Sequence, residues 1–96
     1  MTHREQQKTI ETCLNNAGPG LTARFHCGTD DTDPEWQFLR DDKDTGYSIQ
    51  ISHDEENGDA VAILNFFNES EDAMTSWPSR PIARFTEVVR DASRFL

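Results

Sequence analysis

The sequence contains little that could form a disulfide framework or a metal site. Its two cysteines, Cys13 and Cys27, are not in a CxxC pair, so we expect two reduced thiols, with a Cys13–Cys27 disulfide as the open alternative. The three histidines, His3, His26 and His53, show neither HxxxH nor HExxH spacing. The sequence therefore predicts no metal site and no cofactor.

Long apolar runs are also missing. The longest, Ala60–Leu64, is far too short to cross a bilayer, and residues 1–16 contain neither an apolar core nor a cleavage pattern. The net charge of −9 is repelled by anionic lipid headgroups. We expect a cytoplasmic protein without a membrane partner.

Catalytic signatures are absent as well. The sequence holds no Gly-x-Ser-x-Gly elbow and no glycine-rich phosphate loop. Ser48 and Ser52 alternate with His53 along a predicted strand, so their side chains should point to the other face. We expect no catalytic residues and no enzymatic activity.

A fragment of a calcium-loop pattern occurs at Asp42, Asp44 and Gly46. The glycine comes one residue too early, and the twelfth position is His53 where a calcium loop has glutamate. The pattern does not predict a specific calcium site.

What the sequence does contain is the pattern of one folded domain over residues 1–96, with nine aromatic residues to fill a small core. Thr2 and Glu5 form a capping box that begins a helix near residue 3, and Gly18-Pro19-Gly20 ends it, with Gly18 as a left-handed cap. Alternating apolar residues then predict strands over 21–27, 36–38 and 47–53, and an apolar run predicts a fourth over 60–67.

The connections between these strands have about six residues, which suits hairpins and is too short for crossover helices. Glu69–Pro78 is expected to be a polar connection with one helical turn at Ser70–Met74. Ser79 is expected to cap a last helix that carries Pro81 in its first turn.

The predicted fold is therefore α+β, in the order α-β-β-β-β-α: a four-stranded antiparallel meander with both helices on one face. The residues expected to be buried together between sheet and helices are Phe25, Ile49, Ile51, Ile63, Phe85 and Val89.

The negative charge is concentrated in one segment. Residues 30–59 contain eleven acids against Arg40 and Lys43. In a meander, the first and third loops lie at one end of the sheet and the middle turn, with Asp41, Asp42 and Asp44, lies at the other. Aspartate is a common turn residue, so solvated hairpin loops are the simpler explanation, but the density of acids also suits an anionic binding surface.

We predict that this surface binds a partner. Its expected contact residues lie in and beside the first and third loops, with Trp77 as an exposed aromatic anchor: Asp30, Asp31, Asp33, Glu35, Asp54, Glu55, Glu56, Asp59 and Trp77. The basic residues of the last helix are spaced to pair with its own acids, and they also leave open a homodimer in which that helix docks on another copy's acidic loops.

The leading hypothesis is a small non-enzymatic inhibitor or decoy whose carboxylates imitate phosphates for a basic, nucleic-acid-binding partner, without itself binding nucleic acid. In size, acidity and lack of a motif the chain resembles phage-encoded anti-CRISPR and anti-restriction proteins; the resemblance is one of composition and carries over no functional residue. A toxin immunity protein or secretion chaperone is the alternative, and a small enzyme or ligand-binding module is the third.

Overall fold

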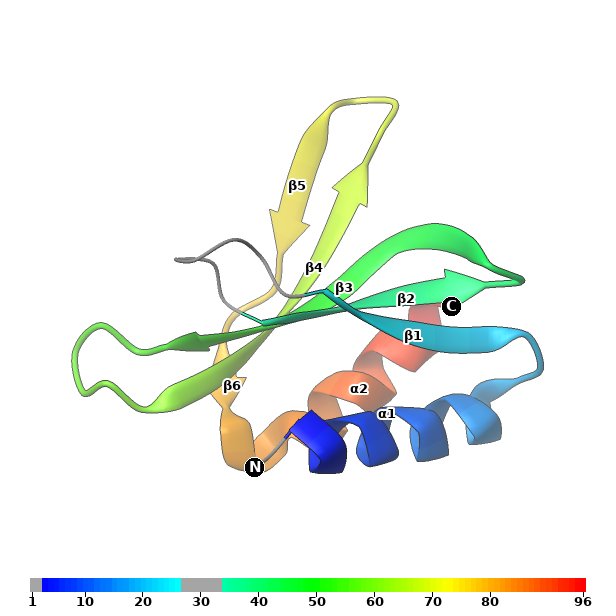
Figure 1. Cartoon of the computed structure of the whole chain (residues 1–96). Coiled ribbons are helices and arrows are strands. Elements are labelled where there is room, and N and C mark those ends of the chain that lie inside the picture. The colour runs from blue at the N-terminus through cyan, green and yellow to red at the C-terminus, as the bar shows by residue number, and fades with distance from the viewer. Residues whose placement is uncertain (1–2, 27–33) are drawn as a thin grey trace.

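A computed structural model describes residues 3–26 and 34–96, and it has two layers (Figure 1). Helices α1 (His3–Ala17) and α2 (Phe85–Phe95) lie on one face of an antiparallel sheet. Its strands are β1 (Leu21–His26), β2 (Glu35–Arg40), β3 (Lys43–His53), β4 (Ala60–Asn68), β5 (Ala73–Ser76) and β6 (Arg80–Pro81).

The sheet follows the chain in the order β1-β2-β3-β4-β5, and β6 also pairs with β4. All pairings are antiparallel. The predicted α+β fold is confirmed, with the two helices on one face, and β5 and β6 extend the predicted four strands. Asp30, Asp31, Asp33, Cys27 and Thr2 lie outside the described residues.

The end of α1 is defined by a backbone hydrogen bond and by the conformation of the glycines that follow it. The Gly18 N–H still donates to the Leu14 carbonyl at 3.2 Å, and the chain reverses at Gly20, which has φ 80°. The left-handed residue is therefore Gly20, and the prediction that Gly18 forms this cap is wrong. Ile10 and Leu14, four residues apart, are buried against the sheet.

The turn between β2 and β3 is tighter than predicted. Strand pairing continues to Arg40 and Lys43, which leaves only Asp41 and Asp42 in the turn. Both have positive φ, 51° and 64°, as in the two-residue turns that match the right-handed twist of a hairpin. Aspartate tolerates this conformation better than most residues.

Residues 69–78 do not form the predicted connection with a helical turn. Asp72, at φ 49°, reverses the chain, and Ala73–Ser76 return along β4 as β5. All four residues of β5 are exposed, so the strand has no alternation of apolar and polar residues that sequence could reveal.

The predicted beginning of the last helix is also wrong. Arg80 and Pro81 pair with Ala62 and Val61 of β4 as strand β6. A 3₁₀ turn at Ile82–Arg84 follows, and α2 begins at Phe85. Proline is tolerated here because β6 lies at an edge of the sheet.

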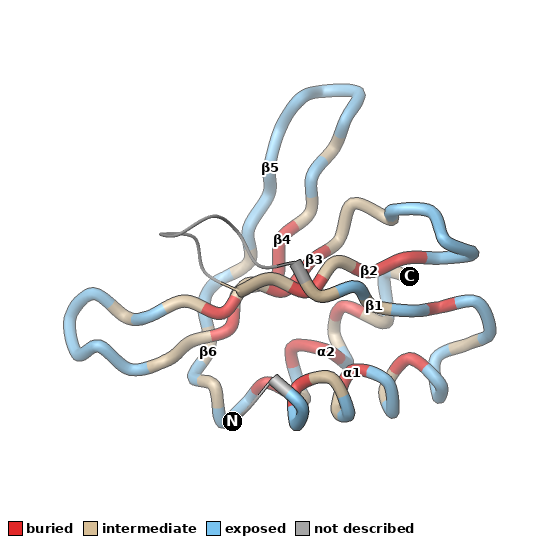
Figure 2. The backbone as a smooth tube through the Cα atoms, viewed as in Figure 1, coloured by how far each residue is buried: buried red, intermediate tan, exposed pale blue. Residues whose placement is uncertain are grey.

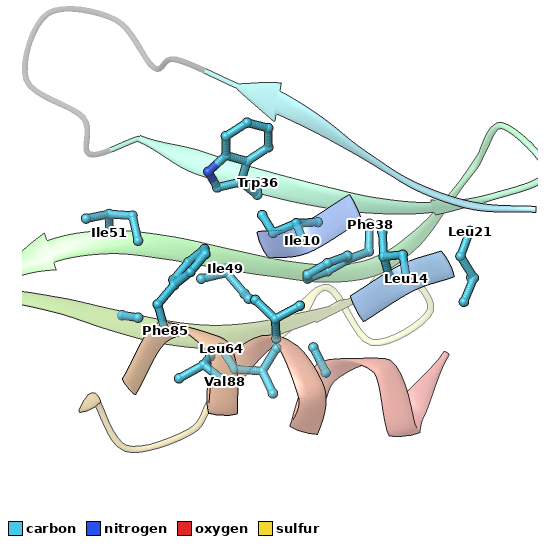
Figure 3. Close-up of a cluster of buried hydrophobic side chains, with 13 residues drawn as sticks. Ile10, Leu14, Leu21, Trp36, Phe38, Ile49, Ile51, Leu64, Phe85 and Val88 are labelled. Carbon is cyan, nitrogen blue, oxygen red and sulfur yellow. The ribbon is translucent and has the colours of Figure 1, made fainter. Parts of the chain in front are cut away.

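The core lies between the sheet and the helices, as Figures 2 and 3 show. Of the six predicted core residues, four are buried and Phe25 packs partly buried against them; the four are Ile49, Ile51, Phe85 and Val89. Ile63 is the error. It pairs with Gln50, whereas Ala62 and Leu64 pair with Ile51 and Ile49 and are buried in its place.

Candidate protein-binding surface

The sheet face that points away from the helices, here called the outer face, carries a row of polar residues. Strand register places these residues side by side across the strands β1 to β5: Arg24, Gln37, Ser48, Asn65 and Ser76. They alternate with core residues, so their side chains leave the sheet on the opposite side.

Hydrogen bonds join most of this row. Arg24 donates to Gln37 Oε1 at 2.9 Å, and Ser76 Oγ donates to Asn65 Oδ1 at 2.6 Å. Asn65 Nδ2 donates to Gln50 Oε1 at 3.3 Å. Hydrogen bonds therefore hold four of the five residues of this row, and Ser48 is the one whose side chain has no such bond to a described residue.

A bulge in β3 shapes one end of this face. The register passes from Gln37–Ser48 to Leu39–Asp44, so extra residues of β3 are accommodated there. Thr45 Oγ1 donates to the Phe38 carbonyl at 2.8 Å, and this bond closes the bulge on β2. Bulges bend a strand and increase its twist. In Figure 1, β3 curves here, and the β4–β5 hairpin rises away from the rest of the sheet.

Gly46 allows β3 and β4 to approach closely at the bulge. It has φ 87°, and a Cβ atom there would lie 2.7 Å from the Phe67 carbonyl oxygen and 2.9 Å from Phe66 Cε2. Its N–H donates to Asp44 Oδ1 at 2.8 Å. The glycine is required both by the backbone conformation and by the lack of space.

Between the bulge and the hairpin lies a hollow of about 460 Å³. Carboxylates from three places in the fold line it, namely Glu35, Asp44 and Glu69, together with the cross-strand pair Phe67 and Met74. We call this site the acidic hollow. Phe67 is 38% exposed and Met74 59%, so the hollow presents apolar surface beside carboxylates.

Among the described side chains of residues 4–25 and 34–96, no cationic group lies within ion-pair distance of the carboxylates of the acidic hollow. The two ion pairs of that part of the chain both belong to the helical side: Arg80–Asp91 at 2.6 Å and Arg94–Asp91 at 3.6 Å. The described cationic side chains therefore do not neutralise this negative charge through ion pairs.

The third loop is exposed as predicted, but its aspartates also serve the turn. Glu55, Glu56 and Asp59 are exposed, and Asp54 is half-buried. Asp54 Oδ1 accepts from the Glu56 N–H at 2.9 Å, which is the local bond that makes aspartate a good turn residue. The start of β2 lies toward the same end of the sheet as this loop, since the Ile51 N–H near the end of β3 donates to the carbonyl of Pro34 at 2.9 Å.

Further acids lie at the opposite end. The β4–β5 turn contains Glu69, Glu71 and Asp72, and the antiparallel order places it at the same end as the β2–β3 turn with Asp41 and Asp42. Sequence reasoning missed this second group because it did not recognise β5.

Trp77 is not the exposed anchor that the sequence predicts. Its ring is only partly exposed and packs at 6.3 Å from Tyr47 and 5.5 Å from Phe95. The large exposed apolar residues of the described chain are instead Phe67, Met74 and Phe95. The exposure of Phe67 could not be predicted from the sequence, because the residue ends a continuous apolar run without alternation.

On the far side of the helices, a groove of about 600 Å³ separates α1 from α2 and is lined by Lys8, Cys13 and Arg90 among others. No group of three or more His, Cys, Asp or Glu residues within the described chain is arranged to hold a metal ion. Neither described helix has the length and apolarity needed to cross a membrane.

Comparison with known proteins finds no matching family model, no matching curated protein and no matching solved structure.

Proposed function

We propose that the protein is a non-enzymatic binding protein whose sheet side engages a basic surface of another protein. The observation that carries the proposal is the acidic hollow, where carboxylates without a described cationic partner and the exposed Phe67–Met74 pair share one open face. Such a combination suits a protein interface, in which apolar contact stabilises the complex and charge selects the partner.

The distribution of charge supports the same proposal. The helical layer, residues 3–17 and 80–96, contains six bases and four acids, whereas the rest of the described chain, residues 18–26 and 34–79, contains three bases and eleven acids. The molecule is thus negative on the side of the sheet and its loops. A basic partner is steered toward that side, because summed charge orients an encounter before contact.

The partner that this chemistry fits best is a nucleic-acid-binding protein. Its lysines and arginines are arranged to neutralise phosphates, and carboxylates on loops offer an alternative set of negative charges. The protein then acts as an inhibitor or decoy of that partner, of the anti-CRISPR or anti-restriction type.

A toxin immunity protein is the second candidate. The exposed Phe67–Met74 pair favours it, because a single cognate partner is often recognised through a small apolar patch. Genomic neighbourhood separates the two: phage genes beside this gene favour the inhibitor, and a toxin gene favours the immunity protein.

The test is capture of host proteins at low and high salt, with nuclease present, followed by a gel-shift assay of each captured protein with its nucleic acid. We expect a salt-sensitive partner whose nucleic-acid binding falls as this protein is added. Unchanged nucleic-acid binding by every captured protein contradicts the decoy function.

A further inference from the structure

We propose that the acidic hollow receives an arginine side chain of the partner, with its guanidinium among the carboxylates and its stem along Phe67 and Met74. This inference rests on the proposed function for the existence of a basic partner. It adds the place and the chemical identity of the anchoring residue.

The carboxylates come from separate strands and converge on one hollow. Glu35 begins β2, Asp44 lies in the β3 bulge, and Glu69 follows β4 directly. Asp44 is held in position by the bond from the Gly46 N–H, which leaves its second oxygen free to accept from a ligand. A guanidinium has five N–H donors in a planar fork and can bond several carboxylates at once.

The apolar side of the hollow favours arginine over lysine. Phe67 and Met74 are neighbours across β4 and β5 and both are exposed. A guanidinium is weakly hydrated and stacks on aromatic faces, whereas an ammonium is a compact and strongly hydrated charge. The aliphatic stem of arginine can cover the methionine at the same time.

A polar side chain in the wall of the hollow provides independent support. Ser48 lines the hollow and is only 8% exposed, and its hydroxyl makes no hydrogen bond to another described residue. No fully enclosed side-chain nitrogen or oxygen of the described residues lacks a partner, so the Ser48 hydroxyl oxygen opens onto the hollow. A guanidinium N–H entering the hollow supplies a partner, since the hydroxyl oxygen can accept it.

The experiment uses two acetylated and amidated peptides that differ at one position, Gly-Val-Arg-Val-Gly and Gly-Val-Lys-Val-Gly. Each is titrated at low salt into the full chain and followed by amide NMR shifts. We expect shifts centred on Ser48, Phe67 and Met74, and binding of the arginine peptide about fivefold or more tighter than that of the lysine peptide.

Isosteric variants locate the site. Asp44→Asn keeps the bond from Gly46 and removes only the charge, so we expect it to weaken binding of the arginine peptide at least about threefold. Asp59→Asn makes the same charge change in the β3–β4 loop and should have a smaller effect. Met74→Gln, at an exposed position, removes apolar contact without threatening the fold and should weaken the arginine peptide more than the lysine peptide.

Equal affinity for the two peptides, or an Asp44→Asn effect no larger than that of Asp59→Asn, overturns the inference. Binding of long polyarginine is measured in parallel at low salt. If polyarginine binds while the hollow variants change nothing, the arginine site is wrong and the proposed basic partner stands. If neither polyarginine nor any captured basic protein binds, the proposed function itself fails.

Discussion

The two faces of the sheet use similar residue types for different purposes. On the inner face, Phe85 is fully buried between sheet and helix. On the outer face, Phe67 stays open beside carboxylates that have no cationic partner in the described chain. On the helical side, a single carboxylate, Asp91, pairs with two arginines, Arg80 and Arg94. The comparison shows that the helical side pairs some of its charges internally, through Asp91, whereas the carboxylates of the acidic hollow pair with no described cationic side chain.

The largest expected difference between the two faces comes from replacing one phenylalanine on each face by alanine and comparing the free energies of unfolding. Phe85→Ala should lower the free energy of unfolding by about 3–5 kcal/mol, because it leaves a cavity in the core. Phe67→Ala should cost about 1 kcal/mol or less, because the ring is partly exposed already. Denaturant unfolding of both variants measures the two values. Equal losses would show that the hairpin is part of the core rather than a free surface.

The shape of the outer face depends on one glycine. Gly46→Ala should destabilise the protein by roughly 2 kcal/mol or more, because it adds a backbone clash to the strain of positive φ. Gly58→Ala is the matched control: Gly58 has φ 74°, but no atom lies within 4 Å of an added Cβ. Thermal unfolding should place Gly46→Ala clearly below Gly58→Ala. Similar values for the two variants contradict a tight contact between the bulge and β4.

The loop carboxylates of the sheet side should matter for binding and not for folding. We expect joint neutralisation of five acids to weaken partner binding about tenfold and to flatten its salt dependence, because exposed charges act on the encounter rate. The set is Asp30, Asp31, Asp33, Glu55 and Glu56, each changed to Asn or Gln. It omits Asp54, whose side chain accepts a turn bond. Unfolding free energy should hold or rise as repulsion is removed.

Matched changes on the helical layer, Glu11→Gln and Glu87→Gln, should leave that binding nearly unchanged. A Trp77→Ala variant tests the opposite possibility, in which apolar contacts rather than charges hold the partner. If the loop variant binds like the native chain while Trp77→Ala abolishes binding, the partner is held by apolar contacts and the acidic loops serve solubility.

Among these substitutions, the one on the helical side is expected to lower the free energy of unfolding least. Asp91→Asn breaks both ion pairs and should cost at most about 1 kcal/mol, because all three side chains are partly solvated. The loss should shrink in 1 M salt, where charges are screened within about 3 Å. Chemical denaturation with urea at two salt concentrations measures it. A loss of several kcal/mol that salt does not change points instead to a structural role for Asp91.

The local elements could be read from the sequence because their signals are local. The 3–4 spacing of Ile10 and Leu14 and the Gly-Pro-Gly stop define α1, and period-two alternation defines β1 and β3. The acidic segment is a property of composition. Strand β5 has neither signal: Ala73–Ser76 is short and exposed, and it is a strand only because β4 offers it a free edge.

The sequence by itself determined that a helix lies toward each end of the chain, that four long strands follow in antiparallel order, and that residues 30–59 form an acidic segment. Tertiary structure alone decided which residues of β4 are buried. In an unbroken apolar run such as Ala60–Phe67, a shift by one residue exchanges the two faces, so Ile63 and Leu64 are equivalent until pairing with β3 chooses between them. The acidic hollow is likewise formed only by the tertiary structure. Glu35, Asp44 and Glu69 are far apart along the chain, and only the bulge at Gly46 and the returning strand β5 bring them around Phe67 and Met74.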